Sequence, residues 1–167
     1  MIEISTADLS SPEHAGATLS LLETYAADIM GGGKSLSPHT RTHLVDELRN
    51  RENCVVVLAW ADDVPAGMAI CFEGFSTFSC QAILNIHDFV VAAEFRRQGI
   101  AMDLLAKIQE VAVERKCCKL TLEVLEGNHV AQRAYQKFGF AGYELDPEMG
   151  RAMFYEKKLS HPPSIPS

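Results

Sequence analysis

The sequence predicts a single mixed α/β domain, and two observations carry that prediction. Hydrophobic residues recur at two periods, helical in some stretches and strand-like in others, and the two kinds of stretch are interspersed along the chain. No linker or internal repeat interrupts them. A length of 167 residues fits one domain, and 47% hydrophobic against 22% charged residues is typical of a globular protein. We therefore expect one domain over 1–160 and a disordered tail over 161–167.

The N-terminal part predicts a short strand over 1–5 and then two helices. Ser10 or Ser11, followed by Pro12, is typical of a helix start. This first helix ends at the glycines 31–33, and its apolar residues recur at helical spacing: Leu19, Leu22, Tyr25, Ala26 and Ile29. Ser37 before Pro38 predicts a second helix that runs to about residue 50, with Leu44, Val45 and Leu48 on its apolar face.

The middle of the chain predicts three strands. Residues 55–60 form a continuous apolar run, as in a buried strand, and 66–73 and 82–92 follow as strands two and three. Asp62 and Asp63 predict a turn, but the Val64-Pro65 that follows argues against a tight hairpin. The next loop contains Phe75 and Phe78, which either lie exposed or fold under.

The C-terminal part predicts two helices and three more strands. Residues 99–115 carry a helical apolar stripe, and a half-buried strand over 120–124 follows. A short helix over 128–138 ends at Gly139, and two last strands are expected near 140–145 and 152–159. The vicinal Cys117 and Cys118 form either a redox pair or, as we favour, a packing position with Cys118 inward.

Composition and charge exclude several classes of protein. A net charge of −7 argues against binding to nucleic acid, and no apolar run approaches the length of a membrane span. The N-terminus lacks the segments of a signal peptide, so we expect the cytoplasm. Five cysteines without C-x-x-C spacing fit neither a disulfide framework nor a zinc site. The charge is uneven, because 1–95 hold four basic against thirteen acidic residues, which favours a cationic ligand there.

The most informative stretch is a strand that leads through a turn directly into a helix, over 89–101. Free N–H groups and a partial positive charge at a helix N-terminus suit a phosphate or diphosphate. Gly99 and Ala101 leave the backbone uncovered, and Arg96 and Arg97 add positive charge. The alternative is an ordinary connection between a strand and a helix, with exposed arginines.

Two motifs in this order resemble a known family. Arg96-x-x-Gly99-x-Ala101 resembles the acyl-CoA motif of the GNAT superfamily of N-acetyltransferases. Asn128-x-x-Ala131-x-x-x-Tyr135, followed by 138–140 (Phe-Gly-Phe), is similar to a second segment of that family. The order of elements agrees over nearly the whole chain. The resemblance implies a mixed, mostly antiparallel central sheet flanked by about four helices.

The resemblance also implies a reaction and its cofactor. It implies an acetyl-CoA-dependent N-acetyltransferase, without a metal, that moves the acetyl group to the primary amine of a small, cationic acceptor by direct attack in a ternary complex. Residues 86–91 most resemble the diamine and polyamine branch, in which two carboxylates precede the apolar residues. Here only Asp88 matches, and His87 stands in the place of the other acid.

Residue roles follow from the same resemblance. Backbone groups of Phe89, Val90 and Val91 are expected to pair with the pantetheine arm, and Tyr135 is expected to protonate the departing thiolate. Asn128 and Ala131 would hold the pantetheine or orient its segment. The N–H groups of the turn are expected to hold the diphosphate, and this set comprises Arg97, Gln98, Gly99, Ile100, Ala101 and Met102, with Arg96 beside them.

The general base and the acceptor site stay open at this point. Strand alternation places His87 and Asp88 on opposite faces unless a bulge intervenes, as it often does in the family. His87, Asp88 and Glu123 are the candidate bases, and Asp88 could instead hold the amine. The acceptor region is expected around the first two helices and the loops, where Tyr25, Asp28, Met30, Lys34 and residues 75–78 lie.

Four alternatives remain besides a small amine acceptor. The acceptor could be an aminoglycoside, an amino acid or a protein amine, or the chain could be a non-catalytic acyl-CoA-binding module. Dimerisation is common in the family, which adds a homodimer to the expectations.

Overall fold

The computed structural model describes residues 1–143, 148, 150 and 152–159, and these form two helical layers around one sheet. The sheet has the order β1-β2-β3-β4-β5: β1 (Ile2–Thr6), β2 (Cys54–Ala61), β3 (Val64–Ser76), β4 (Gln81–Val91) and β5 (Leu120–Leu122). The first four strands pair antiparallel, and β5 pairs parallel with β4. This arrangement confirms the predicted mixed, mostly antiparallel sheet.

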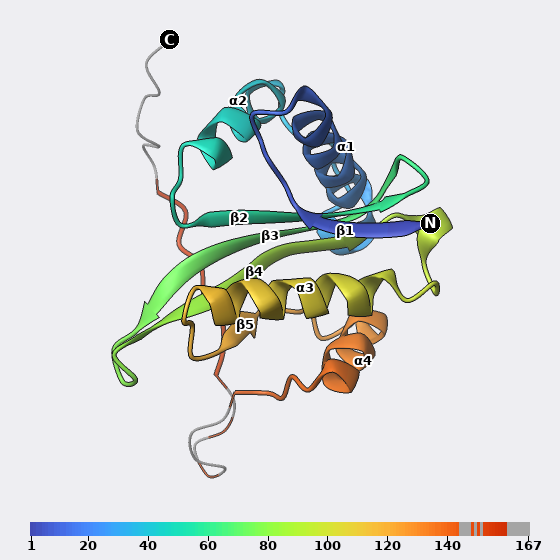
Figure 1. The fold of residues 1–167 in the computed structure, drawn as a ribbon. Helices are drawn as coiled ribbons and strands as arrows, with labels where there is room; N and C mark the ends of the chain where they lie inside the picture. The colour runs from blue at the N-terminus through green and yellow to red at the C-terminus, as the bar shows by residue number, and fades with distance from the viewer. Residues whose placement is uncertain (144–147, 149, 151, 160–167) are drawn as a thin grey trace.

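The helices lie on both faces of this sheet (Figure 1). One layer holds α1 (Pro12–Ala27) and α2 (Pro38–Arg49), with the short 3-10 turn η1 (Ile29–Gly31) between them. The other holds α3 (Ile100–Glu114) and α4 (His129–Phe138), and a second 3-10 turn, η2 (Ala93–Phe95), precedes α3. The predicted helices are therefore confirmed to within a residue or two at most ends.

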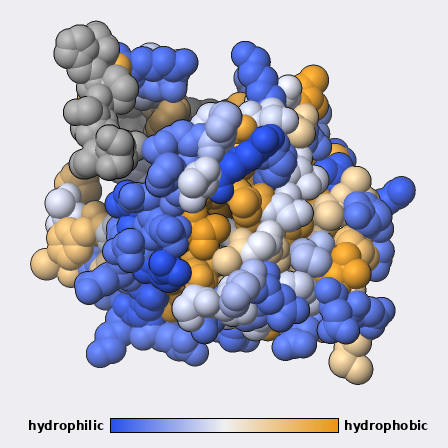
Figure 2. Space-filling model, turned by 90° about the horizontal axis from the view of Figure 1, so that it is seen from above, coloured by the Kyte–Doolittle hydropathy of each residue, from blue (hydrophilic) through white to orange (hydrophobic). Residues whose placement is uncertain are grey.

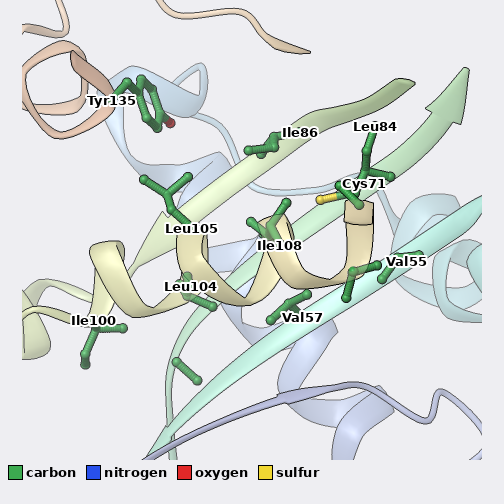
Figure 3. Close-up of a cluster of buried hydrophobic side chains, with 14 of the residues drawn as sticks. Val55, Val57, Cys71, Leu84, Ile86, Ile100, Leu104, Leu105, Ile108 and Tyr135 are labelled. Atoms are coloured by element: carbon green, nitrogen blue, oxygen red, sulfur yellow. The ribbon is translucent and has the colours of Figure 1, made fainter. Parts of the chain in front are cut away.

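Each face of the sheet has its own apolar core. On the α3 face, Leu104, Leu105 and Ile108 are fully buried against β2, β3 and β4 (Figure 3). Gly67 permits this close packing, since a Cβ there would lie 3.0 Å from the Val90 carbonyl oxygen and 3.1 Å from Leu104 Cδ1. On the other face, Leu21, Leu22 and Leu48 of α1 and α2 pack over the sheet. Figure 2 looks onto this second layer, where polar residues surround a strip of apolar ones.

The turn between β2 and β3 corrects one expectation. Ala61 pairs directly with Val64, so Asp62 and Asp63 form a tight two-residue hairpin, with φ of 45° and 66°. Asp tolerates this left-handed region better than most residues, which makes the turn accessible without glycine. The proline at 65 is accommodated because the register shifts by one residue beside it, between Ala59 and Trp60.

The C-terminal expectations are corrected as well. Residues 140–143 and 152–159 form no strand, and 152–159 are exposed, without a strand partner among the described residues. Residues 144–145 and the tail 161–167 lie outside the described residues. β5 ends at Leu122, so Val124 is exposed. Cys117 packs against the α3 core while Cys118 is exposed, the reverse of the favoured expectation, because Lys116 before them is left-handed (φ 58°).

Candidate functional site

The sheet opens between β4 and β5, and this opening is the first element of the site. Their parallel pairing stops at Ile86 and Leu122, although β4 continues to Val91 against β3. The Ala92 N–H donates to the Ala66 carbonyl of β3, at 2.9 Å. Since backbone groups alternate along an antiparallel strand, those of Phe89 and Val91 face away from β3, toward the open edge. An extended ligand can therefore add there in the manner of a strand.

A β-bulge in β4 determines which way its polar side chains point. Ile70 pairs with Asp88 but the next residue, Cys71, pairs with Ile86, so His87 is an extra residue in β4. As a result Ile86 packs in the α3 core, while Val90 packs in the core beneath α1 and α2. Simple alternation would have put both on one face. Strand alternation in the sequence predicts His87 and Asp88 on opposite faces unless a bulge intervenes, and the structure contains that bulge.

His87 and Asp88 both lie on the α1 side of the sheet. The His87 ring meets Phe72 edge-on, with 5.5 Å between centroids, and Phe72 packs with the α1 and α2 core. Asp88 acts electrostatically on Tyr25 of α1 and, with burial, raises the pKa of that phenol. His87 itself is exposed and Asp88 is partly buried. The bulge therefore brings an imidazole and a carboxylate to the same side of the open edge.

Burial gives Asp88 an unusual carboxyl group. Desolvation raises its pKa above 3.8, and the neighbouring His87 opposes this rise. A partly buried carboxylate of this kind is stabilised by a cation, so it suits an ammonium group or a proton taken from one. A carboxyl with a perturbed pKa is a candidate for a functional site, and Asp88 directly precedes Phe89, whose backbone groups face the open edge.

Tyr135 lies across the opening from β4, on α4. Its ring meets Phe89 edge-on at 5.8 Å and Phe140 at 5.8 Å, and only 8% of the residue is exposed. Burial, and secondarily Tyr25, raises the pKa of Tyr135 to about 12. The phenol is therefore protonated at neutral pH and can donate its proton. In Figure 3 it lies at the end of the α3 core away from Val55 and Cys71.

Asn128 and Ala131 form the start of α4. The Asn128 side-chain oxygen Oδ1 accepts from the Ala131 N–H at 3.2 Å, which caps the helix. This contact supports the orienting role expected of Asn128. The cap also fixes the residue at which α4, the helix that carries Tyr135, begins.

The turn before α3 presents a row of unpaired N–H groups. Arg97 and Gly99 have φ of 64° and 90°, and the helix begins at Ile100. Within the part of the chain that the structure describes, the N–H groups of residues 97–101 have no hydrogen-bond partner. Met102 differs from the expectation, because its N–H donates to the Gly99 carbonyl at 2.8 Å. The candidate diphosphate cradle therefore ends at Ala101, and the buried Ile100 can contribute only its backbone.

The structure uses the side chains of this turn differently from the expectation. Arg96 donates from Nε to the Val91 carbonyl at 3.1 Å and from Nη2 to Asp28 Oδ2 at 3.3 Å. The Gln98 side chain donates to the Glu94 carbonyl at 3.2 Å. Sequence reasoning placed Arg96 beside the phosphate and missed the Asp28 contact, since no local pattern links two residues 68 positions apart.

The fold brings some of the sequence candidates to the site and not others. Glu123 directly follows Leu122, the last residue of β5 that pairs with β4, so its backbone lies at the opening. Its side chain is exposed, and Thr121, two residues earlier, accepts a hydrogen bond from Asn85 at 3.0 Å. The tip of the β3–β4 hairpin, with Phe75 61% and Phe78 98% exposed, lies at the other end of β4 from the turn at 96–101 (Figure 1). Tyr25 and Asp28 are the acceptor candidates that the fold brings close.

The described residues offer neither a metal site nor a membrane span. They contain no cluster of three or more His, Cys, Asp or Glu side chains able to hold a metal ion. Across the same part of the chain, no helix is long and apolar enough to span a membrane.

The fold combines a sheet that is open between β4 and β5 with a turn of unpaired N–H groups before α3. The family model described as Acetyltransferase (GNAT) family matches residues 20–140, and the chain belongs to that family. Its curated relatives are N-acetyltransferases, and this chain is an N-acetyltransferase as well. A thialysine N-epsilon-acetyltransferase of Caenorhabditis elegans is 28% identical over 125 residues, which cover 75% of this chain and 76% of that protein.

Further relatives agree in fold and reaction class. An aminoglycoside N(6')-acetyltransferase type 1 of Salmonella typhimurium is 25% identical over 121 residues, covering 70% of this chain and 79% of that protein. A crystal structure of a probable acetyltransferase matches with a TM-score of 0.76 at 25% identity, covering 93% and 99% of the two chains. AAC(6')-Iy, in complex with a bisubstrate analog, CoA-S-monomethyl-acetylneamine, matches in fold with a TM-score of 0.74 at 19% identity, covering 95% and 99%.

Proposed function

We propose that this acetyltransferase uses acetyl-CoA to acetylate the primary amine of a small, cationic acceptor by direct attack in a ternary complex. The observation that carries the proposal is the convergence of three features at one opening of the sheet. The free backbone edge of β4, the protonated phenol of Tyr135 and the partly buried Asp88 all lie there. Each supplies one requirement of acyl transfer to an amine.

The donor would lie along β4 and over the start of α3. The backbone groups of Phe89 and the N–H of Val91 face the open edge and would pair with the amides of the pantetheine arm, with Val90 between them, while the Val91 carbonyl also accepts from Arg96 Nε. The diphosphate would accept hydrogen bonds from the unpaired N–H groups of 97–101, where the dipole of the 15-residue helix α3 adds to the attraction. Ala131, in the first turn of α4, borders the thioester end of this path.

The amine must lose a proton before it attacks the thioester. Asp88 and His87 both lie on the acceptor side, and we assign proton removal to this pair, directly or through water. The amine nitrogen then forms a bond to the acetyl carbon, and the C–S bond breaks with its electron pair left on sulfur. Tyr135 donates its proton to that thiolate, the nitrogen releases its second proton, which restores the phenol through water, and the neutral amide and free coenzyme A leave.

A cationic acceptor fits the charges near the opening. Asp88 and Asp28 both act on Tyr25, so two carboxylates lie on this side of the sheet. The N-terminal 95 residues carry the negative charge of the chain, with thirteen acidic against four basic residues. Thialysine and aminoglycosides, named for the relatives, both carry amino groups. The alternatives are an aminoglycoside, an amino acid or a protein amine as acceptor, or a module that binds acyl-CoA without turnover.

The test is acetyl transfer to a panel of amines, read by mass spectrometry of the acceptor. The panel holds spermidine, putrescine, an aminoglycoside, thialysine and a lysine peptide. We expect turnover on one class of small polyamine or diamine-like acceptor. Acetyl-CoA binding without turnover on any amine would favour the non-catalytic module, and absence of acetyl-CoA binding would overturn the assignment of the 97–101 turn. A homodimer and a cytoplasmic location also stay predictions, and light scattering of the purified chain tests the first.

A further inference from the structure

The guanidinium of Arg96 connects two segments that are far apart in the sequence. Its Nε donates to the Val91 carbonyl at the end of β4, and its Nη2 donates to Asp28 just after α1. Arg can make both contacts at once because its donors form a rigid planar fork. Arg96 is also the residue that leads into the candidate diphosphate turn at 97–101. One side chain therefore joins that turn, the open edge of β4 and the segment after α1.

Asp28 organises the loop over 28–34. Its Oδ1 accepts from the Met30 N–H at 2.9 Å, and its carbonyl accepts from the N–H groups of Gly31 and Gly33, both at 2.9 Å. The Lys34 N–H closes the loop onto the Ala26 carbonyl at 3.0 Å. At Gly31 a Cβ would lie 1.9 Å from the Tyr25 carbonyl oxygen, so the loop packs directly onto the end of α1.

The loop lies on the acceptor side of the site. Tyr25, one turn before Asp28, is affected by both Asp28 and Asp88, and Tyr25 in turn affects Tyr135. The loop is therefore close to the groups that would hold and activate the amine. Its side chains at Ile29 and Met30 are exposed, at 83% and 36%. Exposed side chains of this kind are free to contact a ligand without being needed for the core.

We propose that Arg96 is a positioning residue for the acceptor, which holds the 28–34 loop at the site through Asp28, and that its side chain does not bind the diphosphate. The inference rests on the proposed function, since it assigns the loop to the acceptor of that reaction. Its reason is geometric: Nε and Nη2 of Arg96 bond to Val91 and Asp28, which fixes the guanidinium between these two segments, while the free N–H groups of 97–101 are left for the phosphate. The loop and the turn are thereby coupled by one ion pair.

The test uses Arg96→Gln and Asp28→Asn, separately and together. Asparagine keeps the Oδ1 that caps Met30 but replaces the Oδ2 that accepts from Arg96 with an NH2 group, so it removes the charge and the hydrogen bond to Arg96 together. The pair is partly exposed, with side-chain exposures of 52% and 32%, so a modest effect is expected. We expect the acceptor KM to rise about 2- to 5-fold in each variant, with kcat and the acetyl-CoA Kd within about twofold. The double variant should be no worse than the poorer single variant.

A readout independent of turnover keeps the proposal testable if no acceptor is found. Amide hydrogen exchange at Gly31, Gly33 and Lys34 should accelerate several-fold in Arg96→Gln, because these N–H groups bond within the loop that Asp28 holds. Arg49→Gln is the matched control, since it breaks another surface ion pair, with Asp46 on α2, away from the site. It should change neither KM nor exchange at the loop.

The outcomes distinguish failure of the Arg96 proposal from failure of the proposed function. A weaker acetyl-CoA Kd in Arg96→Gln, with unchanged acceptor KM and unchanged loop exchange, would overturn the proposal and return Arg96 to the phosphate. If the wild-type chain acetylates no amine, the proposed function fails, while faster exchange in the variant would still support the tie between Arg96 and the loop. Additive effects of the two substitutions on exchange would show that Arg96 and Asp28 act separately, against the proposal.

Discussion

The ring of Tyr135 meets the ring of Phe89 edge-on, with 5.8 Å between centroids and 74° between planes. This contact joins α4 to the open edge of β4, across the gap where β5 no longer pairs with β4. It fixes the phenol beside the backbone that we assign to the pantetheine arm. Aromatic pairs of this geometry are favourable beyond the area they bury, so the contact also holds the two elements together.

Tyr135→Phe should lower turnover and leave acetyl-CoA binding intact. The substitution keeps the ring and its contacts with Phe89 and Phe140, but it removes the proton donor. We expect kcat to fall about 10²- to 10⁴-fold, the range of general acid catalysis, with the acetyl-CoA Kd within about twofold. Steady-state kinetics and calorimetry measure the two. Tyr143→Phe, at an exposed tyrosine, is the control, and unchanged turnover in Tyr135→Phe would remove the acid from the mechanism.

Asp88→Asn should make the protein more stable and less active. Burial raises the folded-state pKa of Asp88 above its usual 3.8, so the ionised carboxylate opposes folding at neutral pH. The stability of the neutral form is fully present below the unfolded pKa and is lost as pH rises through the folded pKa. We expect the variant to gain about 0.5–2 kcal/mol in the free energy of unfolding at pH 7.

The pH dependence makes that prediction specific. Urea titrations at pH 7 and at about pH 3.5 should show the gain shrinking at the lower pH, where Asp88 is protonated in the folded state and mostly protonated in the unfolded state. Acceptor kcat/KM should fall about tenfold or more, as a charged contact is lost. Asp46→Asn, at an exposed carboxylate on α2, should give no gain. A gain that persisted undiminished at low pH would contradict the electrostatic explanation.

Gly99→Ala should strain the turn before α3. Gly99 has φ of 90°, a conformation that L residues rarely adopt, and a Cβ there would meet only Asp103 Oδ2, at 4.0 Å. The cost is therefore one of backbone conformation, about 1–2 kcal/mol, and acetyl-CoA should bind about tenfold more weakly as the turn relaxes. Thermal unfolding and calorimetry measure both. Gly16→Ala, in the open interior of α1, should instead stabilise the chain by about 0.5–1 kcal/mol.

Asp63→Gly should stabilise the hairpin between β2 and β3. Asp63 has φ of 66° in a two-residue turn, and Asp-Gly is a preferred sequence there. We expect a gain of up to about 1 kcal/mol in the free energy of unfolding, measured in urea at constant pH. Asp63→Val should lose about as much or more, since a β-branched residue is poorly accommodated at positive φ. A loss in Asp63→Gly would show that the aspartate side chain stabilises the turn.

Sequence periodicity determined the helices and the central strands of this protein. The apolar spacing in 12–27 and 99–115, the capping residue Ser37 and the continuous run 55–60 are local signals, and local hydrogen bonding and burial follow from them. The motif residues Arg96, Gly99 and Tyr135 were found differently, through the resemblance of two short motifs to the GNAT family. Their backbone context, a strand followed by a turn and a helix, is itself local.

The pairing of the strands decided how the side chains of the candidate site are arranged. The register between strands decides two features of the site. It sets the point at which β4 and β5 separate, and it makes His87 the extra residue of a bulge. The contact between Arg96 and Asp28 arises only when α1 packs over β4. Likewise, residues 152–159 have the composition of a strand but find no partner among the described residues. Chain composition therefore determined the elements and the chemistry available, while long-range hydrogen bonding and burial decided which side chains share the site.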